Sequence, residues 1–168
     1  MVLNGVSKAY SMTGWRIGYA AGPQDIITAM TNVQSQSTSN PTSISQVAAE
    51  AALNGDQGCI QPMLTAFRER HLYVVDKLNR IPGVRCLAAG GAFYAFADVR
   101  QAIQNLHKVG RIATATDIAI SDYLLEKSGV AVVPGSAFGL EGYIRLSFAT
   151  SMQNLEQALA RIQQAFTL

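Results

Sequence analysis

The sequence has few of the residues that mark metal-binding and disulfide-rich proteins. It holds only two cysteines, Cys59 and Cys86, which lie far apart among 168 residues. They form no Cys-x-x-Cys spacing, and no cluster of histidines accompanies them, so neither a zinc site nor a disulfide framework is indicated. We therefore expect no metal and two reduced thiols, the usual state of cysteine in the cytoplasm.

A strong excess of one charge and long apolar runs are also missing. The 13 basic residues stand against 11 acidic ones, and the formal net charge is +2. Such a small and scattered surplus argues against nucleic acid or a membrane surface as a partner. No apolar run reaches the roughly 18 to 20 residues that cross a bilayer, and no charged and then apolar leader opens the chain. We expect a cytoplasmic protein.

What the chain does have is an ordinary globular composition. Hydrophobic residues make up 49% of its positions. At this length they suffice for the core of one domain or of one and a half. No internal repeat or low-complexity segment interrupts the pattern, so disorder is not expected.

One short segment sets a lysine and an arginine among small and hydroxyl residues. A lysine that is shielded from water, or lies near a second cation, has a lowered pKa and attacks an aldehyde more readily. Arg16 can be that cation for Lys8, and its planar fork suits phosphate oxygens. Gly14 permits a tight turn, while Ser7 and Thr13 offer hydroxyl donors. The set fits an aldehyde that carries a phosphate, although ordinary solvated turns have the same composition.

The complete string from position 7 to position 23 is more specific than its separate residues. It reads Ser-Lys-Ala-Tyr-Ser-Met-Thr-Gly-Trp-Arg-Ile-Gly-Tyr-Ala-Ala-Gly-Pro. This string resembles the signature of the class I/II aminotransferases that depend on pyridoxal 5'-phosphate (PLP), and its form is most similar to that of the bacterial aspartate aminotransferases. Farther along, Pro-Gly-Ser-Ala-Phe-Gly and then Tyr-Ile-Arg-Leu-Ser, within positions 134–147, resemble the substrate strand of the same family.

The resemblance implies a role for each matching residue. Lys8 would form the internal aldimine with PLP, the one cofactor implied, and Ser7 and Arg16 would contact its phosphate. Ser39 and Asn40 belong to a Ser-Asn-Pro segment that, in the family, crosses the dimer interface toward the neighbour's cofactor. We therefore treat both as cofactor-binding candidates and expect the full-length protein to be a homodimer.

Arg145 and Gly5 are two further positions to which the resemblance applies. The residues alone leave the role of Arg145 open. An arginine on an edge strand is usually solvated, but a guanidinium can also bind both oxygens of a carboxylate. The resemblance implies the second role, namely binding of the substrate α-carboxylate. Gly5 departs from the family, because many relatives place another phosphate-binding serine there.

Apolar periodicity and turn residues predict an α/β fold. The pattern favours a core-facing stripe along the first helix, and we interpret 98–111 as a variable polar excursion. The stripe comprises Ile26, Ile27, Met30 and Val33. Strands are predicted at 2–8, 15–20, 84–87, 92–96, 130–133 and 143–149, and helices beginning at 23, 42 or 43, 62, 116 and 151, the fourth of them ending at Gly129.

The resemblance also implies the architecture and the reaction. The fold would be that of a fold-type I PLP-dependent transferase, with residues 1–61 as the C-terminal remnant of the large PLP-binding domain. Residues 62–168 would form the interdomain helix and the small C-terminal α/β domain. The implied reaction moves an amino group between an amino acid, with aspartate expected, and a 2-oxo acid through the PLP–lysine aldimine.

Other interpretations stay open. The family's large cofactor-binding part precedes the lysine and is missing here, so we expect the chain to be truncated. The chain would then be either a piece of an active aminotransferase or a fragment that is inactive alone and has a folding or dimer-forming role. Another fold-type I PLP chemistry is a further alternative, and aromatic or prephenate-type substrates remain possible.

Overall fold

The computed structural model describes residues 1–167 of an α/β chain that divides into two compact units. The first unit is Met1–Leu64 and the second begins at Thr65. The predicted boundary between residues 61 and 62 refers to the large and small domains of the family, and that assignment stays a prediction.

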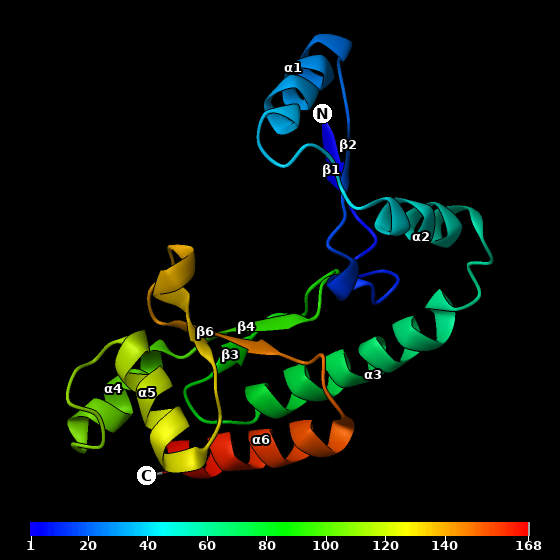
Figure 1. Cartoon of the computed structure of the whole chain (residues 1–168). Helices are drawn as coiled ribbons and strands as arrows, with labels where there is room; N and C mark the ends of the chain where they lie inside the picture. Colours follow the sequence, from blue (N-terminus) through cyan, green and yellow to red (C-terminus); the bar gives the residue numbers. More distant parts are fainter. Residues whose placement is uncertain (168) are drawn as a thin grey trace. The chain divides into compact units, whose positions relative to one another are not determined.

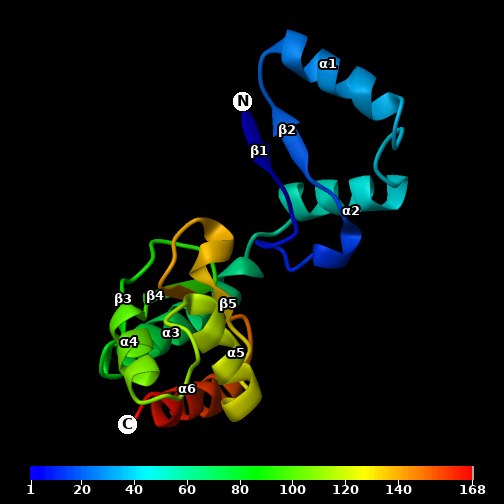
Figure 2. The ribbon, with the colours of Figure 1, turned by 90° about the vertical axis from the view of Figure 1, so that its left-hand side faces the viewer.

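The first unit consists of a two-stranded sheet and helices with little interior. Strands β1 and β2 pair antiparallel, with Val2 opposite Ala21, and a long connection joins them (Figures 1 and 2). Only Val6, Ser45 and Ala49 are buried in this unit. Its elements are β1 (Val2–Asn4), the 3₁₀ helix η1 (Thr13–Trp15), β2 (Tyr19–Ala21), α1 (Gln24–Ser35) and α2 (Ser43–Asn54).

Both strands of this unit are shorter than predicted. The first ends at Asn4, because the chain then forms a helical turn in which the Tyr10 amide donates to the Val6 carbonyl at 3.3 Å. Trp15, predicted to open the second strand, lies in η1 instead. Arg16 has φ +51°, in the left-handed region, so the backbone changes direction there and the ladder begins only at Tyr19.

The prediction that α1 turns an apolar stripe toward a core is wrong within this chain. No residue of α1 is buried. Ile26 and Met30 are exposed, and the side chain of Val33 is 71% exposed. Helical spacing correctly indicated one apolar face on this helix, but periodicity does not say which part of a protein covers that face.

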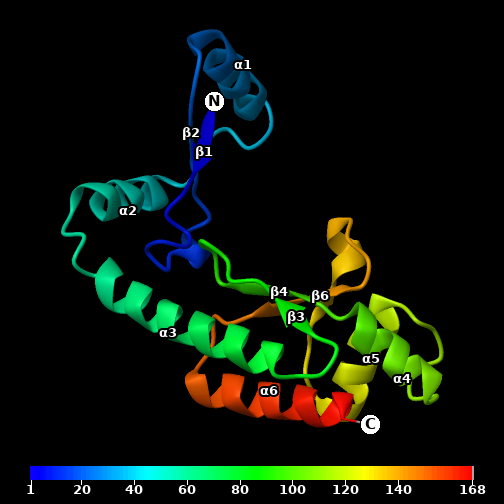
Figure 3. The same ribbon diagram turned by 180° about the vertical axis from the view of Figure 1, so that it is seen from behind.

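The second unit is built around a four-stranded antiparallel sheet with the strand order β3-β4-β6-β5. Helix α3 begins before Thr65 and continues into this unit, where it lies on the same side of the sheet as α6 (Figures 1 and 3). The elements are α3 (Ile60–Asn79), β3 (Arg85–Cys86), β4 (Tyr94–Asp98), α4 (Arg100–Lys108), α5 (Asp117–Ser128), β5 (Val133–Pro134), the 3₁₀ helix η2 (Gly135–Phe138), β6 (Tyr143–Ser147) and α6 (Met152–Phe166).

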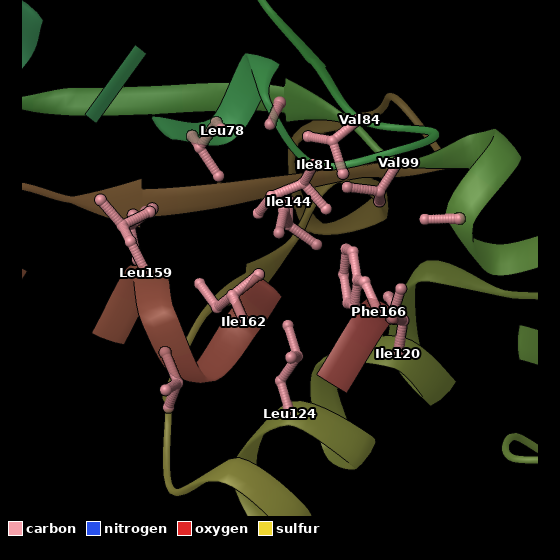
Figure 4. Packing of buried hydrophobic residues seen from close by; sticks show 14 of the residues in the cluster. Leu78, Ile81, Val84, Val99, Ile120, Leu124, Ile144, Leu159, Ile162 and Phe166 are labelled. Atoms are coloured by element: carbon pink, nitrogen blue, oxygen red, sulfur yellow. The ribbon is translucent and has the colours of Figure 1, made fainter. Parts of the chain in front are cut away.

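One hydrophobic core fills the space between this sheet and its helices. Leu78 of α3, Ile144 of β6 and Ile162 of α6 belong to a single buried cluster (Figure 4). Along β6, buried Ile144 alternates with half-buried Tyr143 and Arg145. Since successive strand residues point to opposite faces, one face of the sheet belongs to the core and the other carries Arg145.

Two helices of this unit confirm their predicted ends. Thr116 caps α5 by accepting from the Ala119 amide at 3.2 Å, and Gly129 ends it with φ +62°. Ser151 caps α6 by accepting from the Asn154 amide at 3.2 Å. Each of the two hydroxyls supplies a partner for a backbone group that the helix itself leaves unpaired.

Other predictions for this unit are wrong. Residues 100–108, interpreted as part of a polar excursion, form α4, whose Ala102, Ile103 and Leu106 are buried in the core. The predicted buried strand at 130–133 is a strand only at Val133, in the short β5. The alternative that Arg145 lies on a solvated edge strand does not hold, because β6 pairs with β4 on one side and with β5 on the other.

Candidate functional site

Lys8 lies on a helical turn that directly follows β1. The turn is anchored by Val6, whose side chain is only 1% exposed. The Val6 carbonyl accepts from the Tyr10 amide at 3.3 Å, and the Lys8 carbonyl accepts from the Ser11 amide at 3.2 Å. Ser7 is half-buried and Lys8 is exposed. The buried side chain of Val6, two residues before the lysine, thus anchors the backbone of the turn that carries Lys8.

A glutamine that the sequence did not single out supports this turn. The Tyr10 hydroxyl donates to Oε1 of Gln57 at 2.7 Å. Nε2 of Gln57 in turn donates to the Gly55 carbonyl at 2.7 Å and to the Ala52 carbonyl at 3.0 Å, at the end of α2. The bridge joins positions 47 residues apart, and no local pattern could have revealed it.

Arg16 lies at the other end of the same connection, between η1 and β2. One of its guanidinium nitrogens donates to the Thr13 carbonyl at 2.9 Å. The Trp15 carbonyl accepts from the hydroxyl of buried Ser45 at 2.8 Å, which fixes the end of η1. A guanidinium has five N–H donors, so Arg16 keeps donors for an anion.

Gly5, where the resemblance led us to expect a serine, has little room for a side chain. A Cβ atom on Gly5 would lie 3.2 Å from the Ile17 carbonyl oxygen and 3.3 Å from the Gly18 Cα. Such contacts are tighter than an ordinary van der Waals approach, so a serine would require the neighbouring backbone to shift. The two segments of the connection therefore pack backbone to backbone at Gly5.

Ser39 and Asn40 lie on the exposed loop that follows α1, apart from the Lys8 turn in the sequence. Ser39 has φ +65° and its amide donates to the Gln34 carbonyl at 2.9 Å, while the Asn40 amide donates to the Thr38 carbonyl at 2.9 Å. Both residues are exposed, and neither side chain has a hydrogen-bond partner among residues 1–167. The loop is fixed through its backbone and leaves both side chains open to solvent.

Arg145 belongs to the second unit, whereas the other candidates belong to the first. Its guanidinium carbon lies over the rings of Tyr94 and Phe138, 4.3 Å from each ring centroid. Within residues 1–167 the guanidinium has neither a hydrogen bond nor an ion pair. A half-buried guanidinium without a carboxylate partner is suited to bind one from a ligand.

Comparison with known proteins places the chain in a family. The sequence model of the family described as aminotransferase class I and II matches residues 1–162. The chain belongs to this family. Its members depend in general on PLP.

Individual relatives agree with the family assignment. The chain is 65% identical over 162 residues to the aspartate/prephenate aminotransferase of Nitrosomonas europaea, covering 96% of this chain and 41% of the relative. It is 51% identical over 166 residues to the aspartate aminotransferase of Rhizobium meliloti, covering 98% of this chain and 40% of the relative. The chain thus spans about two-fifths of the length of these relatives.

Solved structures show the same partial match. The crystal structure of the Rhizobium meliloti aspartate aminotransferase superposes with a TM-score of 0.86 at 47% identity, covering 98% of this chain and 41% of that one. The aromatic aminotransferase of Pyrococcus horikoshii OT3 gives a TM-score of 0.85 at 36% identity, covering 96% and 41%. The predicted fold class is confirmed: the chain has the α/β fold of the C-terminal part of a fold-type I transferase.

The described residues contain neither a membrane-spanning helix nor a cluster of metal ligands. No helix within residues 1–167 has both the length and the apolar composition that a bilayer crossing requires. In the same residues, no three side chains of His, Cys, Asp or Glu gather into a group that could hold a metal ion.

Proposed function

We propose that this chain carries the cofactor lysine and the carboxylate-binding arginine of an aminotransferase. The observation that carries the proposal is the connection between β1 and β2, which holds Ser7, Lys8 and Arg16 on turns anchored by buried Val6 and Ser45. The whole reaction would transfer an amino group between an amino acid and a 2-oxo acid.

The side chains in this connection fit PLP. The Lys8 amine is the group that can bond to the cofactor's aldehyde carbon. The Ser7 hydroxyl and the Arg16 donors beyond the one used by Thr13 are suited to phosphate oxygens. When bound, PLP supplies an electron-withdrawing ring, and the protein supplies orientation and charge. Ser39 and Asn40 would reach the cofactor of a second subunit in a homodimer.

The residues of this chain would divide the remaining work between them. The Nζ atom of Lys8 would accept the proton from the substrate α-carbon and return it to the neighbouring position on the cofactor side. A positioned amine of this kind contributes about 10² to 10⁴-fold to the rate. Arg145 would hold the α-carboxylate in a bidentate pair and thereby orient the α-carbon.

The substrate proposal rests on the names of the relatives. Those names specify aspartate, aspartate and prephenate, or aromatic amino acids. Aspartate is the amino acid we propose, with the α-carboxylate read by Arg145. We further propose that the protein acts in the cytoplasm.

A second function is favoured by one observation. Val2, Val33, Ile44 and Val47 are large apolar side chains that the first unit leaves exposed. A unit with so little interior is suited to packing against other protein, so a folding or dimer-forming role without catalysis is the alternative for the isolated chain. In that case turnover would require the rest of a longer protein.

The test for the cofactor site uses the chain itself. The chain is mixed with PLP, reduced with borohydride and digested for peptide mass mapping. Its lysines are Lys8, Lys77, Lys108 and Lys127, so three of them serve as internal controls. We expect an adduct on Lys8 alone and its disappearance in Lys8→Arg. Labelling spread over the four lysines, or no labelling, would contradict the proposed site.

The test for the reaction joins this chain to the part of a relative that it does not span. The chain replaces the matched segment of the Nitrosomonas europaea relative, whose unaltered form is the positive control. We expect amino transfer from aspartate to 2-oxoglutarate, and a loss of more than about 100-fold in Lys8→Ala, because the amine that moves the proton is gone. Retention of amino transfer by the Lys8→Ala protein would refute the assignment.

A further inference from the structure

The guanidinium of Arg145 lies between two aromatic rings. Its central carbon is 4.3 Å from the ring centroids of Tyr94 and of Phe138. Within residues 1–167 these rings make no ring contact with each other. If both rings were on the same side of the Arg145 central carbon, each with its centroid 4.3 Å away, they would contact each other. The two rings therefore lie on different sides of that carbon. The central carbon of the cation thus has a ring on each of two sides, and its N–H groups have no hydrogen-bond partner within residues 1–167 and are left for a ligand.

Tyr94 reaches Arg145 through the register of the sheet. On β4, Phe96 is the direct cross-strand partner of Arg145, and Tyr94 lies two residues away on the same face. Diagonal neighbours of this kind are within reach of aromatic and long side chains. The ladder of β4 and β6 thus determines where the first ring stands.

Phe138 reaches Arg145 from η2, and several contacts hold that short helix. Oδ2 of Asp117, a residue only 1% exposed, accepts from the Ser136 amide at 2.6 Å. A Cβ atom on Gly135 would clash with the Leu140 carbonyl oxygen, so the backbone is closely packed there. The Phe138 ring also packs edge-on against the ring of Phe96, with 6.2 Å between their centroids. The position of the second ring is therefore fixed by η2 and by β4 together.

The hydrophobic effect does not explain why the Phe138 side chain is exposed. The residue is 49% exposed, although the loop that carries it is fixed by a buried carboxylate and a close-packed glycine. Its large ring gains little by burial and instead covers a cation. A planar guanidinium can be covered on both faces and still donate from its edge, which an ammonium cannot do.

We propose that Tyr94 and Phe138 are positioning residues that fix the plane of the Arg145 guanidinium, so that a substrate carboxylate is bound edge-on in that plane. The inference rests on the proposed role of Arg145 as the reader of the α-carboxylate. Without the rings, Arg145 would keep its charge but sample many rotamers on the open face of the sheet, and bidentate pairing would be populated for less of the time.

The test measures the NMR chemical shift of the Arg145 side chain in the whole chain. The Nε–H resonance of Arg145 is assigned by its loss in Arg145→Ala. Two rings beside the cation shift this resonance upfield, and Phe138→Leu and Tyr94→Leu should each reduce that shift. Tyr94→Phe keeps the ring and should preserve it. Tyr73→Leu is the matched control, because it removes a cation–π pair, with Lys77, elsewhere in the same unit.

Carboxylate binding is then measured with maleate as the probe, from its effect on the same spectrum. We expect Phe138→Leu and Tyr94→Leu to weaken maleate binding about three- to tenfold, and Tyr94→Phe and Tyr73→Leu to leave it unchanged. Circular dichroism confirms that each variant is folded.

The outcomes distinguish failure of this inference from failure of the proposed role of Arg145 in binding the α-carboxylate. If Arg145→Ala abolishes maleate binding while the ring-less variants bind as the parent does, Arg145 reads the carboxylate without help from the rings and the inference is overturned. If Arg145→Ala binds maleate as the parent does, or the parent shows no binding, both the inference and the assigned role of Arg145 are overturned.

Discussion

At the scale of single residues, Asp98 and Arg100 form a charged pair at the end of β4. Nη2 of Arg100 lies 2.6 Å from Oδ2 of Asp98, and Nε lies 3.0 Å from Oδ1. The hydrogen bonds from Arg100 hold the pKa of Asp98 below its ordinary value. Because the native pKa is lower than the unfolded one, the pair stabilises the fold above about pH 4 and loses that effect as the pH falls through the native pKa.

This pair leads to a prediction about acid unfolding. Asp98→Asn should be less stable than the parent at pH 7, and the difference should shrink as the pH is lowered through the native pKa of Asp98. Urea unfolding followed by circular dichroism at several pH values measures both effects. Asp122→Asn is the control, since Asp122 is exposed and has no ion pair within residues 1–167. Equal pH dependence in the parent and in Asp98→Asn would contradict the assignment.

The two cysteines lead to a second prediction. Cys86 is buried, and burial raises the pKa of its thiol, whereas Cys59 is exposed. The thiolate is the reactive form, so a disulfide reagent should modify Cys59 rapidly and Cys86 only on unfolding. Cys59→Ser should retain the slow phase alone. Rapid modification of that variant in the native state would show that Cys86 is accessible.

At the scale of elements, the cap of α6 has a measurable contribution. The Ser151 hydroxyl accepts from the Asn154 amide, a group that the helix leaves without a backbone partner. Ser151→Ala should reduce the free energy of unfolding by about 1 kcal/mol. Gln153→Ala, an exposed change in the same helix, is the control. A loss no larger than that of the control would show that the bond is not maintained in solution.

The short helix η2 allows a sharper test of packing. Gly135→Ala would place a methyl group against the Leu140 carbonyl oxygen and 2.7 Å from Cβ of Tyr143. Overpacking of this kind costs about 1 to 3 kcal/mol, and thermal unfolding should show it. Gly91→Ala is the matched control, because a Cβ atom there meets nothing within 4 Å. Equal stability of the two variants would mean that η2 adjusts at little cost.

At the scale of the whole molecule, burial is divided unevenly between the two units. Every member of the main core cluster comes from the second unit, from Val74 to Phe166. The first unit buries only Val6, Ser45 and Ala49. Apolar burial is the main source of stability, so the first unit has little of its own.

Hydrogen exchange of the chain alone tests this division. Backbone amides of α1 should exchange far faster than those of α5 and α6, because α1 has no buried residue, whereas both other helices contribute to the core. Mass spectrometry of peptides from one sample provides the comparison internally. Protection of α1 equal to that of α6 would show that its apolar face is covered in solution.

Local signals account for the part of the fold that was predicted correctly. Thr116 and Ser151 begin their helices with side-chain caps, and Gly129 ends α5 in the left-handed conformation. Such caps depend on a few neighbouring residues. Helix α4 was missed, since its three buried residues are set among glutamine, asparagine and histidine and their burial depends on the rest of the core. The site residues and their roles stay predictions.

The sequence alone determined the family of this protein and the identity of its candidate groups, because the strings around Lys8 and Arg145 are specific in order and spacing. Tertiary structure decided which surroundings those groups have. The bridge from Tyr10 to Gln57 and the two rings over Arg145 join residues that are not neighbours in the sequence. Such contacts arise from strand register and helix packing, and a linear pattern contains neither.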